Sequence, residues 1–389
     1  MFRADVAWHE TCLTGSGGPK TVLSKERAAY WGALTCGLLA TIACHLPIQR
    51  GTAPLPPEDP TYATAVQMRF LGVGGFLIRR GDDVVLTAPL YSNPELTKLD
   101  GVILPDPERI RAFNGHVSDV DAVLVGHAHY DHLMDVPFAL DRSPNAMIYG
   151  NESVAYILNG YTGADSVPRL RPEQIKTLNQ GPENLVDYRM CVQREGPPSK
   201  APDPYPAKGD WVRVPGARVR IRALCSEHPP QFLKTIHRWP GRIYRPRFAP
   251  PQKSDDYQEG ETLAFLIDFL DEAGTKPIFR IYYQDAPTPP TIGQVAPELL
   301  AEKTVDLAIL CAGNFNDVED PGHIVRNTRA HTVVLGHWEN FFMPQRDDPP
   351  KIPGSDVKKI LEVVRSAAEP GTEVILPNPQ AVFVFPVGR

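Results

Sequence analysis

The stretch Asp121-Ala-Val-Leu-Val-Gly-His-Ala-His-Tyr-Asp-His132 decides how this chain folds. Its first half is an apolar run rich in β-branched residues, which predicts a buried strand. Its second half, with the pattern H-x-H-x-D-H, puts four candidate metal ligands where that strand ends: His127, His129, Asp131 and His132. Imidazole nitrogens suit zinc, and a carboxylate adds an anionic oxygen ligand. The first two residues can face one ion and the last two another, so this loop predicts a site for two metals.

Chance or core packing is the alternative explanation, because a single histidine is more often a surface or core residue than a ligand. The later sequence favours the metal site, since three more metal-competent side chains follow predicted strands. His228 follows the strand 218–225, Asp285 follows 278–284, and His337 follows 332–335. Packed sheets gather side chains at strand ends, so we expect these three to join the loop.

Strands and helices are mixed along the whole body of the chain, and no internal repeat is evident. The expected strands are 65–71, 76–79, 83–87, 121–126, 218–225, 262–269, 278–284, 306–311, 332–335, 374–376 and 382–385. The expected helices are 106–113, 151–159, 292–303 and 355–368, the last with Ser355 as its N-cap. This order predicts one α/β domain over residues 62–389 with helices outside packed sheets. Gly72-Val-Gly-Gly75 lacks the spacing of a nucleotide-binding loop and predicts a turn.

Composition limits the classes of function. A net charge of −6 argues against nucleic-acid binding, which needs a basic surface. The 41 prolines, about twice the usual share, favour a loop-rich protein. Six scattered cysteines form neither a disulfide framework nor a cysteine-based zinc site.

The N-terminal segment, residues 1–44, has the sequence features of a secretory signal peptide. Lys25-Glu26-Arg27 precedes a short apolar run, and Thr41-Ile-Ala-Cys44 resembles a lipoprotein cleavage box with Cys44 as the lipidated residue. The leader predicts a true start near residue 22; an ordinary buried helix is the alternative. Residues 45–61, rich in proline, are interpreted as a tether. We therefore expect an envelope lipoprotein or a secreted protein, with a cytoplasmic protein as the alternative.

On these residues the chain resembles the metallo-β-lactamase-fold hydrolases, four-layer αββα sandwiches with a metal site along one edge of their two sheets. The resemblance covers roughly residues 65–385. It implies two divalent ions, zinc first and manganese or iron as alternatives. It assigns His127, His129 and His228 to the first metal, Asp131, His132 and His337 to the second, and Asp285 to the bridge between them.

A closer resemblance is carried by His337-Trp-Glu-Asn-Phe341, which is similar to the His-Trp-Gly-Thr-Phe segment of the N-acyl-phosphatidylethanolamine phospholipase D and UlaG-like lactonase group. Residues 74–78 and Tyr130 agree with that group. Three departures stand beside it: Gln284-Asp-Ala286 for Gly-Asp-Thr, Ala88-Pro89 for Asp-Pro, and Glu339-Asn340 for Gly-Thr. None removes a ligand, but they indicate a divergent branch whose substrate should not be copied over.

The expected chemistry is hydrolysis by a hydroxide shared between two metals, because metal binding lowers the pKa of water. Asp131 is expected to orient that hydroxide, and His323 and Asn314 are candidate substrate-side donors, although a simple turn also explains the segment around Asn314. The long loop after His228 is basic and aromatic. Its Arg238 and Arg242, with Trp338 elsewhere, are the predicted substrate contacts; a solvated surface loop is the alternative.

Three functions follow from this pattern. The first is a hydrolase of phosphodiesters, including lipid-derived ones. The second is a lactonase or carboxylic-ester hydrolase on the same site. The third is a metal-binding envelope protein without turnover. The predicted partner is a small or lipid-like ester, with a membrane tether through Cys44.

Overall fold

The computed structural model describes residues 46–163, 169–178, 210–230, 238–290, 292–313 and 321–387. The chain divides into two compact units, Met1–Leu46 and Pro47–Arg389, and the fold below is that of the second. Cys44 and Asn314 lie outside the described residues. Within the described part, no helix is long and apolar enough to cross a membrane.

Strands and short helices are interspersed along the second unit. The strands are β1 (Ile48–Gly51), β2 (Val66–Gly72), β3 (Gly75–Arg80), β4 (Asp83–Thr87), β5 (Ala122–Leu124), β6 (Met147–Gly150), β7 (Ile175–Thr177), β8 (Val212–Arg213), β9 (Val219–Cys225), β10 (Leu263–Leu270), β11 (Pro277–Gln284), β12 (Leu307–Cys311), β13 (Thr332–Gly336) and β14 (Glu373–Phe385). The α-helices are α2 (Pro107–Phe113), α3 (Tyr130–Leu133), α4 (Val136–Ala139), α5 (Glu152–Leu158), α7 (Pro297–Glu302), α8 (Gly322–Thr328) and α9 (Val357–Ala367). The 3-10 helices are η1 (Leu96–Lys98), η2 (Asn114–His116), η3 (Asn159–Tyr161), η4 (Pro172–Gln174) and η5 (Ser254–Asp256).

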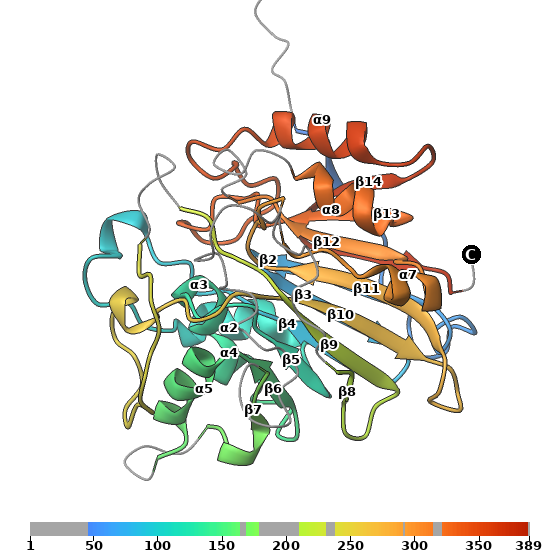
Figure 1. The fold of residues 1–389 in the computed structure, drawn as a ribbon. Coiled ribbons are helices and arrows are strands. Elements are labelled where there is room, and N and C mark those ends of the chain that lie inside the picture. The colour runs from blue at the N-terminus through green and yellow to red at the C-terminus, as the bar shows by residue number, and fades with distance from the viewer. Residues whose placement is uncertain are drawn as a thin grey trace, which may run out of the picture. The chain divides into compact units, whose positions relative to one another are not determined.

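The strands pair in one continuous order, β7-β6-β5-β4-β3-β2-β14-β13-β12-β11-β10-β9-β8, with β1 added to β14. The long strand β14 belongs to both halves of this order. Its start pairs in parallel with β13, and its end pairs antiparallel with β2. The two halves thereby form two sheets that pack face to face and share strand β14 (Figure 1).

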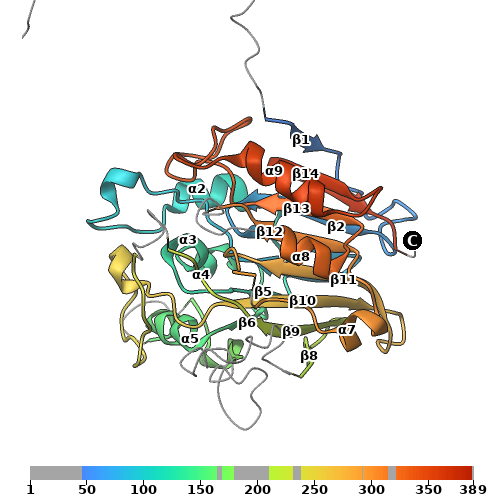
Figure 2. The ribbon, with the colours of Figure 1, turned by 45° about the horizontal axis from the view of Figure 1, so that its top comes forward.

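Three layers of contact hold the sheets and helices together. Between the sheets lies one core cluster, to which β2 contributes Phe70 and β10 contributes Phe265. A second cluster packs the outer face of the first sheet, including Val123 of β5, against the helices α2 to α5. Helices α7, α8 and α9 lie over the outer face of the second sheet (Figure 2). The predicted helix–sheet–sheet–helix order is confirmed.

Several elements differ in extent from those expected. The expected strands 374–376 and 382–385 are one strand, β14. Pro377 and Pro379, which made a break the simpler expectation, lie where the strand passes from one sheet to the other. Helix α7 begins at Pro297 rather than at 292, with proline in its first turn. Within the stretch interpreted as a tether, residues 48–51 form β1 and pair with β14.

The N-cap of α9 is Asp356 and not the expected Ser355. The Asp356 carboxylate accepts a hydrogen bond from the Lys359 backbone N–H at 3.2 Å, whereas the Ser355 hydroxyl donates to the Ile352 carbonyl. We expect Asp356→Ala to lower the free energy of unfolding by about 1 kcal/mol, because a cap oxygen is lost. Urea denaturation of this variant against Lys358→Ala, at the second residue of the helix, tests it. An Asp356→Ala variant as stable as Lys358→Ala would contradict the assignment.

Candidate metal centre

The predicted ligands lie at strand ends that meet at one edge of the two sheets. Strands β9 and β11 both run antiparallel to β10, and β11, β12 and β13 are parallel, so the C-terminal ends of β9, β11 and β13 lie on the same side. These ends supply His228, Asp285 and His337. From the facing sheet, β5 supplies the loop 127–132, whose second half is the single helical turn α3. The edge of the sandwich therefore gathers all seven candidates.

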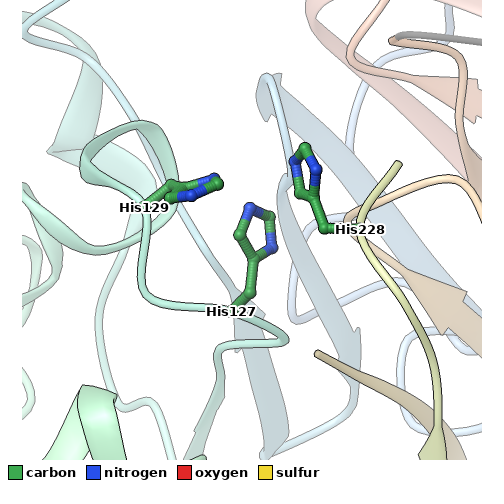
Figure 3. Close-up of side chains that lie close together, drawn as sticks. All are labelled: His127, His129 and His228. Carbon is green, nitrogen blue, oxygen red and sulfur yellow. The ribbon is translucent and has the colours of Figure 1, made fainter. Parts of the chain in front are cut away.

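Three histidine rings form the first ligand group. The donor atoms of His127, His129 and His228 lie within 4.8 Å of one another, and the three rings turn toward a common point (Figure 3). The His228 Nδ1 donates to the Pro229 carbonyl at 2.7 Å, and the His129 Nε2 donates to the Trp239 carbonyl at 3.4 Å. Each of these two rings is thus oriented by one nitrogen and has its other nitrogen left for a metal.

Asp131, His132 and His337 form the second ligand group. The Asp131 Oδ2 lies 3.2 Å from the His337 Nε2 and 3.5 Å from the His132 Nε2. Both imidazole nitrogens thus converge on one carboxylate oxygen. This is the arrangement expected of side chains that share one ion.

Asp285 lies between the two groups. Its Oδ1 accepts from the His127 Nδ1 at 2.9 Å, and its Oδ2 lies 3.6 Å from the His132 Nδ1. It forms a third ligand group with these two histidines, one from each of the other groups. The Gly126 backbone N–H donates to the Oδ2 at 2.8 Å and fixes the carboxylate in this place.

The residues present fit a pair of divalent ions. All seven residues are buried, none more than 8% exposed. Within the described part of the chain, the buried His127 Nε2 and His337 Nδ1 have no hydrogen-bond partner, a costly state unless something binds there. Five imidazoles and two carboxylates are the donor types that zinc, manganese and iron accept.

The protonation of His129, His228 and Asp131 suits metal binding. Burial, reinforced by the neighbouring rings, lowers the pKa of both His129 and His228 well below the usual value. Burial opposes the ionised form of Asp131, but His132 and His337 outweigh it and the pKa of Asp131 is lowered. At neutral pH these histidines are therefore neutral and the carboxylate is charged, which are the forms that bind a metal.

Metal-free protein is expected to lose stability in acid through His132. Burial, reinforced by His127 and His337 against the pull of Asp131, lowers the pKa of His132 from 6.5 to about 4. The unfolded chain therefore binds more protons between these values, so this contribution to stability is complete above pH 6.5 and is lost as the pH falls toward the folded pKa. Between about pH 7 and pH 5 we expect a loss of about 2 kcal/mol relative to His132→Asn. Urea denaturation of both metal-free proteins at the two pH values measures it; a pH-independent difference would contradict it.

The other predicted site residues lie outside the three ligand groups of described residues. Arg238 and Arg242 lie on the loop next to His129, and each is ion-paired, with Asp100 and Glu261 respectively. Trp338 is fully buried and its indole N–H donates to the Pro377 carbonyl at 3.0 Å, so a packing role replaces the predicted substrate contact. His323 is buried on α8.

Trp239 is a site residue that the sequence did not single out. Besides its carbonyl contact with His129, its ring packs edge-on against Tyr130, with centroids 5.3 Å apart. Its backbone has a positive φ of 53°, which is uncommon outside glycine. The loop 238–262 is thus tied to the loop 127–132, and its richness in aromatic residues was the available signal.

One family model and several solved structures are similar to this chain. The family model described as the metallo-beta-lactamase superfamily matches residues 71–225. Similar solved structures include Igni18, a metallo hydrolase from the hyperthermophilic archaeon Ignicoccus hospitalis, with 14% identity over 83% of this chain and 99% of that chain and a TM-score of 0.46. A possible metal-dependent hydrolase from Veillonella parvula has 13% identity, coverage of 82% and 98%, and a TM-score of 0.43. The isothiocyanate hydrolase from Delia radicum gut bacteria has 13% identity, coverage of 82% and 99%, and a TM-score of 0.42.

No curated protein matches the chain. The family match and the layer order together define the class: the chain has the metallo-β-lactamase fold. At the site edge of this fold it carries clusters of histidine and aspartate that can hold metal ions.

Proposed function

We propose that this protein is a metal-dependent hydrolase with two metal ions and that it cleaves phosphodiesters, including lipid-derived ones. The observation that carries the proposal is the position of Asp285. Its carboxylate contacts one histidine of each ligand group. A carboxylate so placed could hold an ion together with either ligand group, and two such ions would supply the chemistry of two-metal hydrolysis.

The chain's own residues supply the rest of the chemistry. When bound, two divalent ions would lower the pKa of water and polarise the bond to be cleaved. Asp131, charged and buried at the second group, orients the attacking water. Trp239 holds His129 through its carbonyl and covers this side of the site together with Tyr130. No serine or cysteine nucleophile is needed.

Arg238 and Arg242 support an anionic substrate. They flank residues 239–241 on the loop tied to His129, and their side chains are 30% and 37% exposed. Each is already paired with a carboxylate; the planar guanidinium, with its five N–H donors, is nevertheless the side chain that best matches the geometry of a phosphate. The ion pairs with Asp100 and Glu261 partly balance the charges of both arginines, so the attraction of this loop for an anion is weaker than its sequence alone indicates.

An exposed apolar surface favours a substrate with an apolar part. The large hydrophobic side chains that are exposed in the described part of the chain are Leu96, Val102, Leu104, Tyr244 and Phe248. All lie on two segments, 96–104 and 244–248. A backbone bridge between Val102 and Lys253, and a hydrogen bond from the Ile103 N–H to the Gln252 carbonyl, connect the first segment to the loop that carries the second. Exposed apolar side chains on two connected segments are a candidate surface for the apolar part of a lipid-like substrate.

Location in the cell envelope is part of the proposal. Cys225, at the end of β9, is disulfide-bonded, whereas Cys311 is free and buried. Disulfides persist in oxidising compartments, which supports an extracytoplasmic protein. Mass spectrometry of the membrane fraction tests acylation at Cys44; an uncleaved chain in the cytoplasm would overturn it.

Metal analysis followed by a substrate panel tests the function. Purified protein should bind two ions per chain and hydrolyse bis-p-nitrophenyl phosphate faster than lactones or aryl esters, and Asp131→Ala should abolish this activity. Faster hydrolysis of lactones or aryl esters would establish the second candidate, a lactonase or carboxylic-ester hydrolase. Zinc- and manganese-loaded protein that hydrolyses nothing, with an Asp131→Ala strain of unchanged phenotype, would favour a non-catalytic metal-binding protein.

A further inference from the structure

His337 adopts a backbone conformation that needs support. Its φ is +56°, in the left-handed region that non-glycine residues rarely occupy. Such a conformation persists only where surrounding contacts hold it. The ring of His337 nevertheless has to reach the Asp131 Oδ2, 3.2 Å from its Nε2. The position of this candidate ligand therefore depends on what holds its main chain.

The support comes from the turn between β2 and β3. The His337 backbone N–H donates to the Val73 carbonyl at 2.9 Å. Val73 itself has a φ of +53°, unusual for a β-branched residue, and is fully buried. Two strained residues at the ends of different strands thus meet through one hydrogen bond.

Glu339 completes the link between the His337 turn and the β2–β3 turn. Its Oε1 accepts a hydrogen bond from the Val73 backbone N–H, and the residue is only 3% exposed. Val73 is thereby held at both of its backbone polar groups, by Glu339 through its N–H and by His337 through its carbonyl. The motif that this segment resembles has glycine at the position of Glu339, and glycine offers no side-chain acceptor. The connection is a property of this chain's own sequence.

We propose that Glu339 is a positioning residue, which fixes the metal ligand His337 by tying the left-handed turn at the end of β13 to the β2–β3 turn through Val73. The inference rests on the proposed metal centre and deepens it. Glu339 is thereby expected to support only the second ligand group, which consists of Asp131, His132 and His337. Metal binding by the first group should not depend on it. A residue that only stabilised the fold would affect both groups alike.

Zinc titration of the metal-free full chain against a chromophoric chelator tests this assignment. In Glu339→Ala we expect the ion at the second group to bind 10- to 100-fold more weakly or to be lost. This is roughly the effect of removing an outer contact to a metal ligand. Glu339→Gln keeps an oxygen acceptor for the Val73 N–H and should remain within about threefold of the wild type. Glu373→Ala, an exposed carboxylate at the start of β14, is the control and should change nothing. Cobalt-substituted protein should show an altered visible spectrum for one of its two ions only.

A second readout does not depend on metal. Amide hydrogen exchange in the metal-free protein should be faster at Val73 and His337 in Glu339→Ala, and unchanged in Glu339→Gln. Should the alanine variant not fold, Glu339→Met keeps the length of the side chain without an acceptor and should behave in the same way.

The outcomes separate the two proposals. Wild-type affinity for both ions in the alanine or methionine variant, with unchanged exchange at His337, would overturn the role of Glu339 and leave the proposed function intact. Equal weakening of both ions would also overturn it, in favour of a general structural role. A wild type that binds no second ion would overturn the two-metal function, while the exchange measurement still decides whether Glu339 holds His337.

Discussion

Replacing Asp285 with asparagine is expected to remove the second metal ion and to lower kcat/KM by roughly 10³-fold, equivalent to about 4 kcal/mol of transition-state stabilisation. Asp285 accepts from the His127 Nδ1 through one oxygen and from the Gly126 N–H through the other. An asparagine has one oxygen and one NH2 group, so it cannot accept at both places. One donor would face another donor, and the charge that joins the two ligand groups would be lost.

Metal content by mass spectrometry and steady-state kinetics measure this effect together. Asp82→Asn, on the exposed turn between β3 and β4, is the matched control because it makes the same chemical change away from the site. Two ions per chain and unchanged kinetics in Asp285→Asn would show that Asp285 does not join the metal positions.

The local pattern of the chain predicted where the candidate residues lie in the fold, and the reason is physical. Each candidate follows an apolar run, and such runs end where the sheet ends. His228, Asp285 and His337 could therefore be placed at one edge before any contact was known. Strand β4 was predicted with the bounds that the structure gives it, Asp83–Thr87, because turn residues delimit it on the N-terminal side and Ala88-Pro89 follows it.

Contacts between residues that are far apart in the sequence leave no such pattern in it. The ion pairs of Arg238 with Asp100 and of Arg242 with Glu261 join positions that neither periodicity nor spacing connects, so the sequence showed a basic loop where the structure shows partly balanced charges. The same holds for Trp239, which contacts His129 through its backbone carbonyl. A backbone group carries no residue type that a motif can show.

Gly126→Ala is expected to disrupt the centre from a residue that binds no metal. A Cβ at this position would lie 2.3 Å from the Asp285 Oδ1 and 2.6 Å from the Leu263 carbonyl oxygen. The Leu263 carbonyl belongs to β10, which is paired on both sides and cannot move away. The strain would therefore fall on Asp285, pushing it from its contacts with His127 and the Gly126 N–H.

We expect this single methyl group to lower the free energy of unfolding of the metal-free protein by about 3 kcal/mol, the upper range for overpacking a buried site. It should also weaken both metal positions, since Asp285 lies between them. Gly115→Ala is the control, because a Cβ there meets nothing within 4 Å. Thermal unfolding and zinc titration of the two variants give the comparison. If Gly126→Ala matched Gly115→Ala in both, the approach of the β5 loop to Asp285 could not be as close as the fold requires, and the two sheets would have to meet differently at this edge.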